Sequence, residues 1–274
     1  MRYVKKRAII FWIPMMANGI IYAIIPFVIP GRHFPEDDFI LYGLDPMFES
    51  PNFEIASFLL TVSIALTIYA SSTITAFLIV ITGYIEAQML ALGQEISQIW
   101  DDAFHNIETS LNEDQNEQRE ETNNIMLNSF IRDSLKNILK LHITNINMIN
   151  QVEAVFRGAI AVEFILLFVS ITAVLLGGLE NTYLELPYGL MQVAVDCFTG
   201  QRLIDASIYF ENSVYFCKWE NFDNRNMQTI LLILQASQKS LTLSAGGLTA
   251  LSFPCLMSVL KSIYSTFTTL HSAL

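Results

Sequence analysis

Four long stretches of this chain are almost free of charged side chains. Residues 8–30, 55–85 and 240–260 contain none, and residues 158–179 contain only Glu163. Each is long enough for a helix to cross the hydrocarbon core of a bilayer, which takes about 20 apolar residues. Lipid offers no water to the backbone amides, and a helix satisfies them internally. The pattern therefore favours an all-α, polytopic membrane protein over a soluble protein with buried core helices.

A fifth apolar stretch, residues 186–209, is interrupted by Asp196, Arg202 and Asp205. The composition agrees with lipid contact, because only 15% of the residues are charged, whereas soluble domains carry about 25%. The sequence predicts one transmembrane domain over residues 1–274. Its five or so crossings are expected at about residues 8–30, 55–85, 157–179, 186–209 and 245–270.

Lysine and arginine gather on one side of these crossings, and such residues are enriched in cytoplasmic loops. The pattern predicts a multi-pass protein with a cytoplasmic N-terminus and an extracellular C-terminus. The net charge of −11 does not conflict, because the rule counts basic residues near helix ends. These basic residues precede the first and third crossings and follow the fourth: Arg2, Lys5, Lys6, Arg7, Arg132, Lys136, Lys140, Arg157, Lys218, Arg225 and Lys239.

The longest polar region, about residues 86–156, is expected in the cytoplasm. Residues 101–121 carry eight acidic side chains against one basic and have no apolar periodicity, so residues 101–124 are predicted to be a mobile acidic loop. Apolar residues recur at helical spacing on both sides of it. These flanks predict cytoplasmic helical extensions that form a packing platform. A further amphipathic cytoplasmic helix is expected at about residues 225–243.

Ser244-Ala245-Gly246-Gly247 separates that amphipathic helix from the last crossing. Two glycines permit a bend or break between helices, and small residues permit close helix approach. The last crossing is rich in serine and threonine. It fits a helix that lines an aqueous path, and it fits equally a packed helix whose hydroxyls bond back to carbonyls.

No motif for catalysis, phosphate binding or zinc binding is present, so we expect neither an enzyme nor a cofactor or metal site. Asp196 lies within a crossing, where a charge is a functional candidate by default. It could face a water-filled cavity or pair with Arg202. Aromatic residues such as Phe58 and Tyr188 near the outer interface fit an interfacial belt or an apolar ligand pocket that opens outward.

The C-terminal third resembles the insect odorant receptors. The resemblance rests on a Tyr-x-x-x-Trp pattern at Tyr215 and Trp219, on Gly246-Gly247, and on Tyr264-Ser265, with Leu141-His142-Ile143 and Gly200 before them. The earlier half is similar to the family in helix pattern and loop lengths. Family members are longer and have seven crossings, so the resemblance implies that this chain corresponds to the last five.

The resemblance implies an olfactory receptor, the odorant-binding subunit of a heteromeric, ligand-gated, non-selective cation channel in the plasma membrane of sensory neurons. The partners would be a co-receptor subunit in a heterotetramer, volatile apolar molecules and membrane lipids, with no nucleic acid. By depth alone, ligand contacts are expected from Tyr22, Phe58, Leu59, Tyr188, Met191 and Gln192. Pore-lining residues are expected at Tyr264, Phe267, Thr268 and His271.

Two other functions stay open on the residues alone. A transporter should show broken helices in both halves, and a single glycine-broken segment is visible here. A G-protein-coupled receptor would place its N-terminus outside the cell. The chain could also be a truncated, non-functional receptor that lacks the first two crossings.

Overall fold

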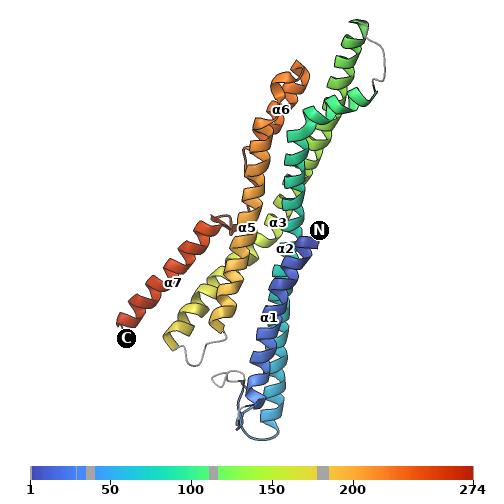
Figure 1. Cartoon of the computed structure of the whole chain (residues 1–274). Helices are drawn as coiled ribbons and strands as arrows, with labels where there is room; N and C mark the ends of the chain where they lie inside the picture. Colours follow the sequence, from blue (N-terminus) through green and yellow to red (C-terminus); the bar gives the residue numbers. More distant parts are fainter. Residues whose placement is uncertain (1, 29, 35–40, 111–116, 178–184, 274) are drawn as a thin grey trace. The chain divides into compact units, whose positions relative to one another are not determined.

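The computed structural model describes residues 2–28, 30–34, 41–110, 117–177 and 185–273, and the described chain is almost wholly helical. This confirms the predicted all-α membrane fold. A 3-10 turn, η1 (Trp219–Asn221), and two short strands, β1 (Ser244–Ala245) and β2 (Thr249–Ala250), interrupt the helices. The helices, labelled in Figure 1, are α1 (Arg2–Val28), α2 (Asn52–Ser110), α3 (Glu117–Gly177), α5 (Glu185–Phe216), α6 (Asn224–Ser237) and α7 (Phe253–Ala273).

Within the described residues, three helices are both long and apolar enough to cross a membrane: α1, α2 and α3. The other two predicted crossings coincide with α5 and α7, which form as helices of 32 and 21 residues. The count of five crossings therefore stays a prediction, and the multi-pass membrane character is supported.

The acidic loop predicted over residues 101–124 is wrong at both ends. Helix α2 continues to Ser110 and α3 begins at Glu117, while residues 111–116 lie outside the described residues. The chain between Gly93 and Gly158 contains no glycine or proline. Charge alone does not end a helix, because Glu, Gln and Arg are good helix formers.

The last two helices are shorter than expected. The amphipathic helix predicted at 225–243 ends at Ser237, and the last helix, predicted from 245, begins at Phe253. Residues 244–250 form an antiparallel hairpin instead, with Ser244 opposite Ala250 and Ala245 opposite Thr249. We call residues 244–250 the linker hairpin, because they join α6 to α7.

The chain divides into two compact units. Unit 1 contains Met1–Ile81, Ile165–Asp196 and Leu256–Leu274. Its main apolar cluster joins Phe11 and Met15 of α1 to Ile79 of α2, with Tyr188 and Met191 of α5 packed against it. Figure 1 shows α1 beside the first part of α2.

Unit 2 contains Thr82–Phe164 and Cys197–Cys255. Its interior is lined by fully buried aliphatic and aromatic side chains, and the linker hairpin belongs to it. The largest of these side chains come from α2, α3, α5 and α6 and from the segment after α6: Ile85, Met89, Ile96, Ile131, Leu135, Ile138, Ile149, Leu203, Phe210, Ile233 and Leu243.

Candidate functional site

Three of the predicted ligand residues lie together on α5 in unit 1. The Tyr188 hydroxyl lies 2.7 Å from Ser71 Oγ of α2. One turn further, Gln192 Nε2 donates to Thr75 Oγ1 at 2.5 Å. Both pairs join residues 117 positions apart, so α2 and α5 run parallel here with one face of each in contact. Residues four apart share a helix face.

An apolar wall borders these polar pairs. Tyr188 and Met191 pack against the buried cluster that includes Phe11 and Met15 of α1. An apolar surface with a few fixed hydroxyl and amide groups is the usual lining of a small-molecule site, in which the polar groups orient the ligand. The α1–α2–α5 contact of unit 1 is therefore the candidate ligand site.

The other predicted ligand residues are not all part of this contact. Phe58 is 68% exposed and Leu59 is 48% exposed, while Tyr22 of α1 is half-buried. Depth in a crossing does not decide which side of a helix faces its neighbours, and exposed aromatic residues on a membrane helix are suited to lipid contact.

The predicted pore residues lie on α7. Tyr264 is 69% exposed, and the Phe267 and His271 rings are 5.6 Å apart. Thr268 Oγ1 donates to the Ser265 carbonyl at 2.9 Å. Thr269 and Ser272 also donate to carbonyls of their own helix, so three hydroxyls near the end of α7 bond back to carbonyls, as one of the two open interpretations expected. The other interpretation, an aqueous path, stays a prediction.

The Gly246-Gly247 pair forms the turn of the linker hairpin, so the predicted bend between two helices is a short strand pair. Both glycines have positive φ angles, 65° and 75°, and the Leu248 amide donates to the Ala245 carbonyl at 3.1 Å. Consecutive residues at φ > 0 are typical of the tight hairpin turns that glycine favours. The conformation of the turn therefore explains why glycine occupies both positions, independently of helix packing.

Tyr215 lies in the last turn of α5, and Trp219 begins η1. The Trp219 indole Nε1 donates to the Tyr215 carbonyl at 3.2 Å, which satisfies one of the free carbonyls at the helix C-terminus. Between them, burial raises the pKa of the Cys217 thiol to about 11. A thiol held in this neutral form packs as a small apolar group.

An ion pair with one buried partner was not predicted from the sequence. Arg202 of α5 donates from Nε and Nη2 to Glu86 Oε1 of α2, at 2.9 and 2.5 Å. Only 6% of the Glu86 side chain is exposed, against 46% of the Arg202 side chain. The partners are 116 residues apart, so no local pattern marks them. The signal available in the sequence was Glu86, which directly follows the charge-free residues 55–85.

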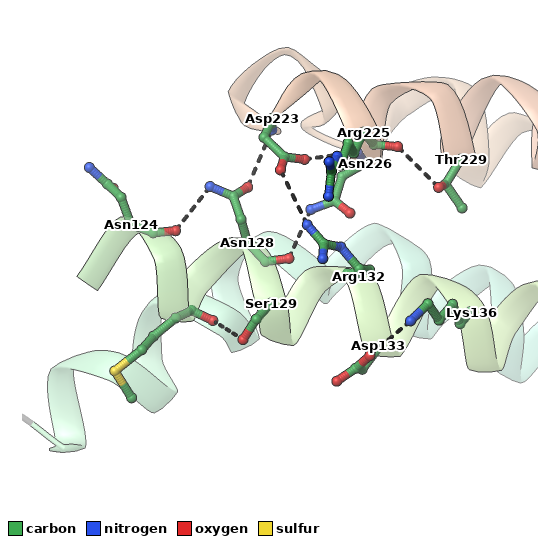
Figure 2. A network of polar contacts seen from close by, with 11 residues as sticks. Asn124, Asn128, Ser129, Arg132, Asp133, Lys136, Asp223, Arg225, Asn226 and Thr229 are labelled. Carbon is green, nitrogen blue, oxygen red and sulfur yellow. Dashed lines mark hydrogen bonds and ion pairs between the residues drawn. The ribbon is translucent and has the colours of Figure 1, made fainter. Parts of the chain in front are cut away.

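A second polar network joins α6 to α3 in unit 2 (Figure 2). Asp223 caps α6 by accepting from the Asn226 amide at 2.8 Å, and it lies 3.7 Å from Arg132 Nη2. The Asp223 amide donates to Asn128 Oδ1 at 3.2 Å. The cap of α6 is thus also its attachment to α3, beside a hollow of about 240 Å³ lined partly by Asn124 and Arg132.

His142 of α3 lies in the interior of unit 2, with its ring 4.6 Å from that of Phe210. Burial lowers the pKa of this imidazole, and the nearby backbone of Ala236 acts in the opposite direction. Across the described residues, no group of three or more His, Cys, Asp or Glu side chains is arranged to hold a metal ion.

Comparisons with known proteins place these features in a family. The family model described as 7tm Odorant receptor matches residues 2–179 and 186–264. Odorant receptor 22c of Drosophila melanogaster is 25% identical over 230 residues, which cover 81% of this chain and 54% of that receptor. The chain thus spans about half the length of this curated relative.

Two structures of the insect olfactory receptor OR5 from Machilis hrabei are similar in fold. The complex with eugenol has a TM-score of 0.73 at 15% identity and covers 100% of this chain and 66% of OR5. The other has a TM-score of 0.76 at 14% identity, with coverage of 98% and 67%.

Proposed function

The chain belongs to the 7tm odorant receptor family, and on this premise we propose that it is the odorant-binding subunit of a heteromeric, ligand-gated, non-selective cation channel in olfactory neurons. The observation that carries the proposal is the family match over almost the whole chain, residues 2–179 and 186–264. The chain is a multi-pass membrane protein of a receptor family rather than of an enzyme family. The chain spans 54% of the length of its Drosophila relative. We therefore propose, for this chain, the activity of a complete receptor.

The ligand we propose is a small, mainly apolar volatile molecule. Its support is the contact of α1, α2 and α5, where Tyr188 and Met191 pack against the apolar cluster that contains Phe11 and Met15. On the same helix, Gln192 donates to Thr75 Oγ1. Tyr22, Phe58 and Leu59 are proposed as further contacts. Such a site discriminates ligands mainly by shape, at roughly 1–3 kcal/mol per methylene.

The ion path we propose is lined by α7, with Tyr264, Phe267, Thr268 and His271 facing it. A co-receptor subunit would complete the heterotetramer, and the extended parts of α2 and α3 with α6 would form the cytoplasmic anchor. The proposed orientation in the plasma membrane has the N-terminus inside the cell and the C-terminus outside. An odorant opens such a channel only if it binds the open arrangement more tightly than the closed one.

The direct test is co-expression with an insect odorant receptor co-receptor and recording of currents evoked by a broad panel of volatile molecules. We expect an inward current that is absent from cells expressing the co-receptor alone. A variant with Tyr188→Ala should respond to a different set of molecules or at higher concentrations. If the chain reaches the cell surface and no molecule evokes a current, the channel proposal is wrong.

Membrane topology gives a second, independent test. An epitope tag at each end should be accessible on intact cells only at the C-terminus. An accessible N-terminal tag would favour a G-protein-coupled receptor. If coding sequence for two further crossings precedes Met1 in the gene, the same recordings on the longer product separate a truncated receptor from a working one.

A further inference from the structure

The linker hairpin is fixed to α3 by a short polar contact. Ser244 Oγ donates to Glu153 Oε1 at 2.5 Å and accepts from the Gly247 amide at 3.1 Å. The Ser244 hydroxyl therefore links a carboxylate of α3 to the turn of the hairpin. Hydrogen bonds that include an ionised partner are shorter and stronger than neutral ones.

The backbone of the linker hairpin and of Leu251, which follows it, also lies directly against two helices of unit 2. The Gly246 amide donates to the Arg157 carbonyl of α3 at 2.9 Å. A Cβ atom added at Gly200 of α5 would lie 2.3 Å from the Leu251 carbonyl oxygen, so only glycine permits this approach. The segment before α7 is thus held between α3 and α5.

The first turn of α7 is held by α5 as well. The Phe253 amide donates to Gln201 Oε1 at 3.2 Å, and the Cys255 amide to Ser252 Oγ at 3.3 Å. The first amides of a helix have no partner within it, so these two side chains complete the N-terminus of α7. The rings of Phe198 and Phe253 are 6.3 Å apart.

Helix α7 belongs to both units. Its residues up to Cys255 are part of unit 2, and Leu256–Leu274 are part of unit 1. We infer that Glu153 and Gln201 are positioning residues for α7, which hold the linker hairpin and the first turn and thereby set how readily the helix changes position. The expected consequence is a shift of the equilibrium between closed and open channels, and this part of the inference rests on the proposed function.

A change at the fixed end of α7 acts without contact to the odorant. Loss of the Glu153–Ser244 contact should change the basal current. It should also shift the half-maximal odorant concentration about three- to tenfold, which corresponds to the net free energy of one hydrogen bond. The order of potency among odorants should not change, because the candidate ligand site in unit 1 is intact.

The test compares Glu153→Ala, Ser244→Ala and the double variant, co-expressed with the co-receptor. The two changes should be non-additive, because each removes the same contact. Glu153→Gln keeps an acceptor oxygen and should restore most of the wild-type response. Gln151→Ala changes an exposed residue of the same helix and serves as the matched control. Unchanged basal current and half-maximal concentration in Glu153→Ala and Ser244→Ala would overturn the inference.

A measurement without current separates this inference from the proposed function. Cys255 lies in the first turn of α7 and is partly buried, whereas Cys197 and Cys217 are buried. The rate at which N-ethylmaleimide labels Cys255 in isolated membranes should rise several-fold in Glu153→Ala and Gln201→Ala, and not in Gln151→Ala. Labelling of Cys197 and Cys217 reports unfolding, in which case the milder Ser244→Ala decides.

If the wild type carries no current, the proposed function fails, and Cys255 labelling still judges the role of Glu153 and Gln201. If Cys255 is labelled at the wild-type rate in both variants, the positioning role is wrong even where the channel conducts.

Discussion

Helices α2 and α5 contact each other in both units, and the chemistry of the contact differs. In unit 1 the partners are neutral: Ser71 with Tyr188 and Thr75 with Gln192, each 117 residues apart. In unit 2 the partners are charged: Glu86 with Arg202 of α5, 116 residues apart, and Asp101 with Lys218, two residues after the end of α5 and 117 residues from Asp101. The spacing is the same within one residue, and only the side-chain type changes.

This difference shows that the parallel packing of α2 and α5 determines the sequence spacing of the partners. The environment of each contact, lipid or water, determines whether the partners are neutral or charged. From Ile55 to Ile81, α2 of unit 1 carries no charged residue, as expected for a segment in lipid, where a charge is costly. Neutral hydrogen bonds between membrane helices are tolerated and contribute modestly. In unit 2 the Arg202 side chain is 46% exposed, so water can share the cost of the ion pair.

The largest loss of stability should follow from disruption of the Glu86–Arg202 pair. Replacing Arg202 by Met removes the guanidinium beside a carboxylate that is 6% exposed. Loss of one partner of a buried pair costs about 3–5 kcal/mol, and we expect about 2–3 because Arg202 is half exposed. The melting temperature of the solubilised protein should fall by about 5–10 °C. Adding Glu86→Gln should restore much of it, and a double variant no more stable than Arg202→Met contradicts the pair.

An intermediate loss of stability is expected at Gly93 of α2, which lies close to Tyr209 of α5 in unit 2. A Cβ atom at Gly93 would lie 2.7 Å from a ring carbon of Tyr209, so Gly93→Ala must displace that ring. Overpacking costs about 1–3 kcal/mol, and the better helix propensity of alanine returns up to about 1. Gly158→Ala on α3 has nothing within 4 Å and should leave the melting temperature unchanged or raise it. Equal shifts for the two variants would show that the close approach is unimportant.

A smaller effect is expected for the neutral pairs of unit 1. Tyr188→Phe removes the hydroxyl that contacts Ser71, while Ser71 still donates to the Thr67 carbonyl at 3.1 Å. We expect a loss of about 0.6 kcal/mol, the mean for hydrogen bonds between membrane helices. Thermal unfolding in lipid nanodiscs measures it. Tyr69→Phe, at an exposed tyrosine of α2, is the matched control, and a loss as large as that of Arg202→Met would reverse the ranking of the two units.

The smallest loss of stability should follow from disruption of the exposed pair of unit 2. The Lys218 and Asp101 side chains are 49% and 62% exposed, and exposed pairs contribute about 0–1 kcal/mol. Lys218→Met should therefore shift the melting temperature by a degree or two at low salt, and the shift should vanish at about 0.5 M salt, where screening is strong. A shift that persists at high salt would mean that the pair is shielded from water.

The helices were predictable because their signal is local. The charge-free stretches at 8–30 and 55–85 became α1 and parts of α2, and Pro14 and Pro26 did not end α1. Neighbouring membrane helices and local adjustments can compensate a proline in such a segment. The two ends of the acidic segment, residues 101–110 and 117–124, are helical, so a run of acidic residues does not by itself predict a loop.

For the site, the sequence predicts depth along a crossing and no more. Tyr188 and Phe58 are both expected near the outer end of a crossing, but Tyr188 packs against the apolar cluster of α1 and α2, whereas Phe58 is 68% exposed. Which side of a helix is covered depends on partners more than 100 residues away, such as Ser71 for Tyr188. The hydroxyls at Ser71 and Thr75, four residues apart on α2, were the available signal for the facing side.

The separation of 117 residues between Ser71 and Tyr188 also sets a schedule for biosynthesis. At about 5–20 residues per second, the ribosome completes Tyr188 about 6–23 seconds after Ser71. Until then the hydroxyl of Ser71 can use the carbonyl of Thr67 in its own helix. No guanidinium from α5 can reach Glu86 in that interval, because Arg202 is 116 residues behind it. The neutral hydroxyls can therefore bond within their own helix before α5 is made, whereas the ion pair of Glu86 with Arg202 forms only after α5 is made.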